Sequence, residues 1–278
     1  MQRRQFLPGA GAVLALLTGA AAGPACADEA ADLALKAALA APHRTPAFVA
    51  RDGWRHPQET LGFFGLQPGQ TVVELSPGAG WYTEILAPLL RERGLLILGA
   101  NDPASIHAYY RRAAERLKAK LDARPDVYDR VQVSVFEPPT RLLSVAPGSV
   151  DRVLTFRNVH NWAAEGEATV LAVFKSVHEA LKPGGVFGVV DHRLPPDRVQ
   201  DAKASSGYVQ VAYVRRLAEA AGLRLDAASE INANPKDTAD HPGGVWALPP
   251  TFANKDADRA RYAAIGESDR FTLRFVKP

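Results

Sequence analysis

Thr71-Val-Val-Glu-Leu-Ser-Pro-Gly-Ala-Gly-Trp-Tyr82 is the stretch of this 278-residue chain that decides its fold. Its first residues are apolar and β-branched around Glu74, which is typical of a buried strand with an acidic residue near its end. Gly78 and Gly80 follow, and because neither has a Cβ, the backbone can turn sharply and a ligand can approach closely. A helix is expected to begin at Trp81. The pattern indicates the cofactor site of an α/β protein, with an ordinary strand-to-helix turn as the alternative.

The same stretch argues against two common phosphate sites. A dinucleotide fingerprint has a third glycine three residues after the second, and Thr83 occupies that position. No Lys-Ser or Lys-Thr pair follows the turn, as a P-loop requires. A nicotinamide oxidoreductase is therefore a weaker hypothesis than a site for another nucleotide-like cofactor.

The first 27 residues resemble a twin-arginine secretory signal. Arg3 and Arg4 precede an apolar stretch, residues 10–22, and small residues before Asp28 offer a cleavage site. The apolar stretch is short and rich in Gly and Ala, which favours removal over stable membrane insertion. A lipoprotein modified at Cys26 is the alternative, although the residues before it lack the usual aliphatic side chain. We expect a periplasmic protein.

Removal of residues 1–27 changes what the composition says. Of the 33 basic residues two lie in the signal, which leaves 31 against 30 acidic residues. A charge balance near zero gives no footprint for nucleic acid. The single Cys and the single Met also lie in the signal. The remaining chain has no thiol for catalysis, disulfides or metal binding, which suits an oxidising compartment.

Apolar periodicity alternates between strand and helix from about residue 70 onward, which predicts a parallel sheet with crossover helices. Residues 28–69 read as a helical lead-in that caps the cofactor cleft, and residues 70–278 as one domain. Pro88 is expected to kink or break its helix. The expected strands are at about 71–75, 95–100, 131–135, 151–156, 185–190, 223–231 and 271–276, and the expected helices near 81–93, 104–121, 166–181 and 207–221.

Several segments together resemble the class I S-adenosylmethionine (SAM) methyltransferases. Glu74, Ser76, Gly78 and Gly80 match their first motif, except that Ser76 stands where a glycine is usual. Residues 181–185 resemble the turn before the fifth strand, and residues 156–162 a histidine-containing motif after the fourth. With residues 229–241 and 264–270, the chain is similar to a group of exported bacterial proteins known as predicted methyltransferases of unknown substrate.

The resemblance implies a Rossmann-like, seven-stranded, mostly parallel sheet with a terminal antiparallel strand and helices on both faces. It also implies SAM as the cofactor. Ligands of such sheets bind beyond the carboxyl ends of the strands. Glu74 and the backbone of Ser76, Gly78 and Gly80 would face the methionine part, where backbone N–H groups at the helix start suit a carboxylate.

Two acidic residues are candidates for the adenosine part. Asp102 follows the second strand, where a carboxylate can accept two hydrogen bonds from a ribose diol; a cap on the next helix explains it equally well. Glu137 follows the third strand and could reach the adenine amino group, or be an exposed loop acid.

His160 is the candidate catalytic base, with His192 at the end of the fifth strand as a second catalytic residue. Histidine is the side chain whose ordinary pKa lies near neutral pH, which suits deprotonation of an oxygen or nitrogen nucleophile. A histidine bonded to backbone at the strand edge is the alternative. The expected substrate-binding residues are Arg157, Asn158, Trp162, Arg193, Asn234 and His241.

Arg157 and Arg193 would favour an anionic substrate if both point into the cleft. His160, His192 and nearby aspartates make a metal-dependent enzyme conceivable, but no pair has the spacing of a known metal motif, so no metal is predicted. The leading hypothesis is a SAM-dependent methyltransferase acting on a small molecule. Because SAM is made in the cytoplasm and the chain carries an export signal, a non-catalytic binding protein on the same fold is the alternative.

Overall fold

The structure is a computed structural model that describes residues 24–278, with side chains from residue 29 onward. Most of the predicted signal, residues 1–23, lies outside the described residues, and its last four residues begin helix α1 (Pro24–Leu39). Among the described residues, none of the helices has the length and apolar character needed to cross a bilayer.

Seven strands form one sheet in the order β3-β2-β1-β4-β5-β7-β6. β1 to β5 run parallel to one another, and β7 pairs antiparallel with both β5 and β6. The predicted fold class is confirmed, including the antiparallel last strand. The strands are β1 (Thr71–Leu75), β2 (Leu95–Ala100), β3 (Gln132–Val135), β4 (Val150–Phe156), β5 (Leu181–His192), β6 (Arg224–Ser229) and β7 (Arg270–Val276).

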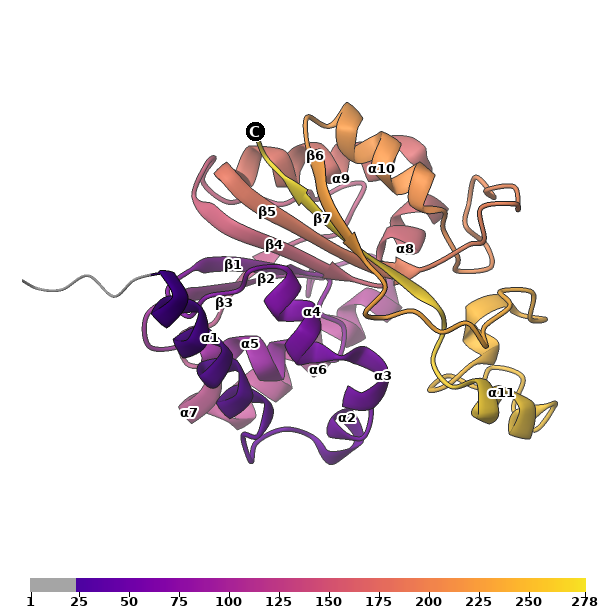
Figure 1. Cartoon of the computed structure of the whole chain (residues 1–278), viewed down its shortest axis with the longest axis horizontal. Coiled ribbons are helices and arrows are strands. Elements are labelled where there is room, and N and C mark those ends of the chain that lie inside the picture. The colour runs from indigo at the N-terminus through magenta and orange to yellow at the C-terminus, as the bar shows by residue number, and fades with distance from the viewer. Residues whose placement is uncertain (1–23) are drawn as a thin grey trace, which may run out of the picture.

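Helices cover both faces of the sheet (Figure 1). One face carries α1, α4 (Pro57–Phe63), α5 (Thr83–Leu90), α6 (Ala108–Ala123) and α7 (Pro125–Tyr128), and the other carries α8 (Val159–Ala164), α9 (Glu167–Ala180) and α10 (Val211–Ala220). The shorter helices lie at the edge where the strands end: α2 (Pro46–Val49), α3 (Asp52–Arg55), a 3-10 turn η1 (Gly244–Ala247) and α11 (Arg259–Ile265).

The alternation of β1 places its side chains in two separate cores. Val72 packs in the cluster that holds Ile85 of α5, whereas Val73 and Leu75 pack in the cluster that holds Phe174 of α9. Successive side chains of a strand point to opposite faces, so Glu74 shares the α5 face with Val72. This is how the sequence directs the acidic residue toward the start of α5.

Pro88 lies inside α5 and does not break the helix at that residue. A proline removes the N–H that would bond the carbonyl four residues earlier, here that of Glu84. The Nε2 atom of His43 lies 2.7 Å from that carbonyl oxygen and takes the missing partner's place. The lead-in therefore satisfies the group that Pro88 leaves open.

The predicted turn at residues 181–185 lies within β5 as a bulge. Val150 pairs with Leu181 and Arg152 pairs with Val186, so one residue of β4 faces four of β5. Gly184, with φ of +74°, provides the left-handed conformation that this detour requires. The sequence turn thus precedes the regular part of the strand, as expected.

Candidate active site

A cavity of about 320 Å³ opens at the carboxyl ends of β1, β4 and β5. Its walls come from the turn after β1, the end of β4, α8, the end of β5, the lead-in helices α2 and α3, and the segment between β6 and β7. This is the edge where ligands of open α/β sheets bind. The lead-in forms one wall of the cavity, as the sequence indicated.

The turn after β1 adopts the glycine-type backbone that its motif predicts. Gly78 and Gly80 have φ of +60° and +78°, and Ser76, at the usual glycine position, has φ of +50°. Asn158 holds this turn from below, because its amide nitrogen donates to the carbonyls of Leu75 and Ser76 at 3.1 and 3.4 Å. Nothing lies within 4 Å of where a Cβ on Gly78 would be, so the turn leaves space for a ligand.

Glu74 is buried, and its Oε2 accepts a 2.7 Å hydrogen bond from the hydroxyl of Thr83. Burial raises the pKa of Glu74 to about 7, and the Thr83 bond opposes this shift. Thr83 is the residue that replaces the third glycine of a dinucleotide fingerprint. Its hydroxyl therefore supports the acidic residue where a glycine could not.

His160, Asp191 and His192 form a buried group on the floor of the cavity. Asp191 Oδ1 lies 2.9 Å from His160 Nδ1 and also accepts from the backbone N–H of His192 at 2.7 Å. A carboxylate only accepts hydrogen bonds, so in a neutral His160 ring the proton lies on Nδ1 and Nε2 keeps its lone pair. Burial lowers the pKa of His192 well below its usual value, and Arg157 adds to this shift. His192 is therefore neutral at pH 7, with its Nδ1 2.5 Å from the hydroxyl of Ser268.

His160, Asp191 and His192 are close enough to bind one metal ion together, because their donor atoms all lie within 4.8 Å of one another. The surrounding charge opposes a cation: Arg157, Arg270 and Arg55 each contribute to the lowered pKa of His192. Asp191 is also engaged by two backbone N–H groups and by His160. We therefore assign no metal to this group.

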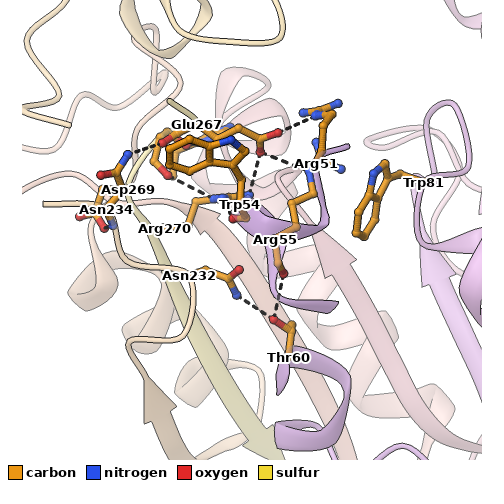
Figure 2. Close-up of polar contacts among 12 residues, drawn as sticks. Arg51, Trp54, Arg55, Thr60, Trp81, Asn232, Asn234, Glu267, Asp269 and Arg270 are labelled. Atoms are coloured by element: carbon orange, nitrogen blue, oxygen red, sulfur yellow. Dashed lines mark hydrogen bonds and ion pairs between the residues drawn. The ribbon is translucent and has the colours of Figure 1, made fainter. Parts of the chain in front are cut away.

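Arg51 and Arg55 enter the cavity from the lead-in and share the carboxylate of Glu267, which lies just before β7 (Figure 2). Arg51 Nε lies 2.5 Å from Glu267 Oε1, and Arg55 Nε lies 3.2 Å from Oε2. Arg270 adds a third guanidinium at 3.1 Å. The sequence interpretation missed these arginines as ligand-binding residues, although their i, i+4 spacing in the predicted capping segment was a signal.

Asp102 and Glu137 do not line the cavity. Asp102 Oδ1 accepts from the backbone of Ala104 at 2.8 Å within the loop after β2, and because α6 begins only at Ala108, Asp102 does not cap that helix as the alternative for this residue required. Glu137 accepts from the backbone of Asp102 at 3.1 Å and from the hydroxyl of Ser105 at 2.6 Å. Both acids stabilise the loop after β2, and the structure gives neither a direct route to a ligand in the cavity.

Four expected substrate-binding residues also lie outside the cavity lining. Trp162 is buried in the core against Phe136, with ring centroids 5.8 Å apart. Arg193 pairs with Asp269 through two contacts of 2.8 Å, so it does not point inward as the anion argument required.

Asn234 and His241 organise the segment between β6 and β7. The amide of Asn234 donates to the carbonyls of Ile265 and Glu267, and His241 Nε2 lies 2.8 Å from a carboxylate oxygen of Asp237. These contacts position the segment that carries Glu267 into the wall. Of the predicted site residues, the structure brings together Glu74, Ser76, Gly78, Arg157, Asn158, His160 and His192 at the cavity.

Comparison with protein-family models and with characterised protein sequences found no match. Solved structures do match. A SAM-dependent methyltransferase from Aquifex aeolicus is 16% identical, with a TM-score of 0.55, over 84% of this chain and 95% of that chain. Geranyl diphosphate C-methyltransferase from Streptomyces coelicolor A3(2) is 14% identical, with a TM-score of 0.55, over 87% and 88%. A (4+2) cyclase is 14% identical, with a TM-score of 0.54, over 81% and 80%. The chain therefore has the fold of the class I SAM-dependent methyltransferases.

Proposed function

We propose that the protein is a SAM-dependent methyltransferase that acts on an oxygen or nitrogen nucleophile of a small molecule. One observation carries the proposal: the turn from Glu74 to Gly80, with its three positive φ angles, opens on the cavity where His160 also lies. A cofactor turn and a candidate base thus share one chamber.

The residues present fit the methionine half of SAM. The turn leaves space at Gly78, which lines the cavity together with Ser76 and Ala79. For the adenosine half, Asp102 lies outside the cavity lining and its second carboxylate oxygen lies 3.6 Å from Arg141, so Asp102 does not supply the expected partner of a ribose diol in this structure. When bound, SAM supplies an electrophilic methyl group for in-line displacement.

The chain's own contribution to the reaction is positioning and proton transfer. Asp191 orients His160 through its Nδ1 atom, so Nε2 of the neutral ring can accept a proton from the attacking hydroxyl or amine. His192 stays neutral beside it, which avoids a second positive charge on the cavity floor. Trp246 lies across from His160, with ring centroids 6.1 Å apart, and helps to exclude water from that side.

Isothermal titration calorimetry with S-adenosylhomocysteine tests the cofactor assignment. We expect one saturable site in the wild type. Ala79→Trp, which puts a large side chain on the exposed turn residue lining the cavity, should weaken binding at least about tenfold. Ala257→Trp changes an exposed residue away from the cavity and serves as the control. Absence of saturable binding, or equal binding by both variants, would contradict the assignment.

The alternative, a non-catalytic binding protein on this fold, is favoured by one observation. Asp102 and Glu137 bond to the loop after β2 rather than face the cavity. Fold alone does not decide between catalysis and other uses, and a cyclase shares this one. Mass spectrometry of small molecules released from the purified protein distinguishes the two: a ligand other than SAM or its product supports the alternative.

We also propose that the chain is exported through the twin-arginine signal in residues 1–27. The motivation is the Arg-Arg pair followed by the apolar stretch and the small residues before Asp28. Cell fractionation, with mass measurement of the purified protein's amino terminus, checks this. A chain that begins at Met1 and stays in the cytoplasm would overturn it.

A further inference from the structure

The arginines of the cavity have more hydrogen-bonding capacity than their neighbours use. Arg55 is 1% exposed, yet its Nη1 and Nη2 have no hydrogen-bond partner among the described residues, and neither does Nη2 of Arg51. Arg157 also lines the cavity, and no side-chain hydrogen bond or ion pair links it to the described part of the chain. Buried donors without partners are rare in proteins and carry a free-energy cost. These groups give the cavity hydrogen-bond donors that its own side chains do not use.

The charge around these groups is unbalanced. Within residues 29–278, Arg51, Arg55 and Arg270 contact a single carboxylate, that of Glu267. Arg157 stands at the end of β4 with φ of +63°, and the charge of Glu267 acts on it without a hydrogen bond or ion pair between the two side chains in the described chain. Burial lowers the pKa of Arg55 to about 9 and that of Arg157 to about 10. Both side chains stay charged at pH 7, and both would gain from an anion.

The acids on the remaining sides do not neutralise this charge. Asp191 is engaged by His160 and by two backbone N–H groups. Glu74, on the β1 wall, bonds to Thr83 and has its pKa raised to about 7, so it is only partly ionised at neutral pH. The guanidinium side of the cavity therefore keeps an excess of positive charge.

Aromatic rings stand next to the guanidinium groups. The Arg55 guanidinium lies 4.7 Å from the centroid of Trp81, and Tyr82 stacks on Phe156 at 3.5 Å. Phe48 and Trp246 line the cavity as well. Figure 2 shows the ring of Trp81 facing Arg55, with Glu267 on the far side of the arginine. A flat apolar body with an anionic end fits such a chamber.

We propose that the substrate carries a carboxylate or phosphate group bound by Arg55 and Arg157, with Arg51 beside them. This rests on the proposed function in that the substrate is the methyl acceptor. The place of these arginines in the fold favours binding of the acceptor over binding of the cofactor. Arg157 follows β4, and Glu267, the ion-pair partner of Arg55, is next to Ser268 in the chain. Ser268 in turn bonds to His192 at the end of β5. The methionine turn belongs to β1. Planar guanidinium forks are the preferred partners of carboxylates and phosphates.

Calorimetry with small aromatic anions tests the proposal without the unknown acceptor. Benzoate and phenyl phosphate are the probes, and benzamide is the neutral counterpart of benzoate. We expect saturable 1:1 binding of at least one anion at millimolar concentration, weakened by salt, and no binding of benzamide. Failure of both anions to bind at about 10 mM, or binding of benzamide as tight as that of benzoate, overturns the proposal.

Two variants locate the site. Arg157→Asn breaks no side-chain hydrogen bond or ion pair in the described chain, and asparagine tolerates the left-handed backbone at this position, so it should fold. Arg55→Met removes the buried fork. Each should weaken anion binding roughly 10-fold to 100-fold, as expected for a lost charged hydrogen bond. Arg216→Gln, at an exposed position of α10, removes one positive charge away from the cavity and should leave anion binding unchanged. Equal binding in Arg157→Asn and the wild type overturns the assignment.

Cofactor binding by the same variants separates the possible sources of the anion. S-adenosylhomocysteine carries a carboxylate, and 5′-methylthioadenosine does not. Unchanged affinity for both supports an anionic acceptor. Loss of affinity for S-adenosylhomocysteine alone shows that the arginines bind the cofactor's carboxylate, which overturns the proposal. If the wild type binds benzoate but not S-adenosylhomocysteine, the anion site stands and the methyltransferase function fails.

Discussion

Glu267→Gln removes the carboxylate that three arginines share, and its cost can be worked from the structure. These arginines lower the pKa of Glu267 from 4.5 to about 2, against the opposing effect of burial. This lowering of the Glu267 pKa corresponds to about 3 kcal/mol of stability at pH 7. Loss of one partner from a buried ion pair costs about 3–5 kcal/mol, which agrees. We expect the variant to be about 3 kcal/mol less stable at pH 7.

The pH dependence of this loss distinguishes electrostatics from packing. Because the folded-state pKa of Glu267 lies below its unfolded value, its stabilisation is complete above about pH 5 and falls as the pH drops toward 2. Urea unfolding from pH 7 to pH 3 should show the gap between variant and wild type narrow by about 2 kcal/mol. Glu92→Gln, an exposed residue paired with Arg91, is the control and should cost well under about 1 kcal/mol. A gap that is constant with pH, or below about 1 kcal/mol at pH 7, would refute the reasoning.

Further outcomes follow from the other groups of the site. Ser76→Gly should stabilise the fold by about 0.5–1 kcal/mol in urea unfolding by releasing a left-handed serine, whereas Ser144→Gly, at an ordinary φ, should destabilise it. Glu74→Gln should become more stable relative to the wild type by about 3 kcal/mol as the pH rises from 4.5 to 8. The reason is that burial raises the pKa of Glu74, so its ionisation destabilises the folded wild type. A stability difference that does not vary with pH would contradict this. The ring of His192 should not titrate in NMR spectra between pH 5 and 8. Calorimetry with Zn²⁺ should show no tight binding at His160, Asp191 and His192. Saturable Zn²⁺ binding that His160→Ala abolishes would contradict our conclusion that these residues hold no metal.

The sequence predicted what depends on local periodicity and backbone chemistry. The strand over residues 71–75 and the glycine turn after it were found as expected, because alternation and missing Cβ atoms are local signals. The local bond from Asp102 to the backbone of Ala104 is present, but α6 begins only at Ala108, so the expected helix cap is not.

The missed contacts depend on partners far away in the chain. Arg55 was not chosen because Glu267, its partner, lies 212 residues later. Arg193 was chosen by its place at a strand end, but Asp269 pairs with it. Trp162 was placed in the cavity as if residues 156–162 continued a strand end. Helix α8 begins at Val159 instead, and residues two apart on a helix face different directions, so His160 lines the cavity while Trp162 enters the core.

The ion pairs of Arg51 and Arg55 with Glu267 determine at which stage of folding the cavity is complete. Glu267 is separated from Arg51 by 216 residues and from Arg55 by 212 residues. Contacts of such long range form late in folding, after the intervening chain has closed. The last strand must therefore be synthesised and paired before the cavity has its full set of charges. If the chain is exported in the folded state, the cavity is complete before export. If it is exported unfolded, the cavity forms only after the chain has crossed the membrane.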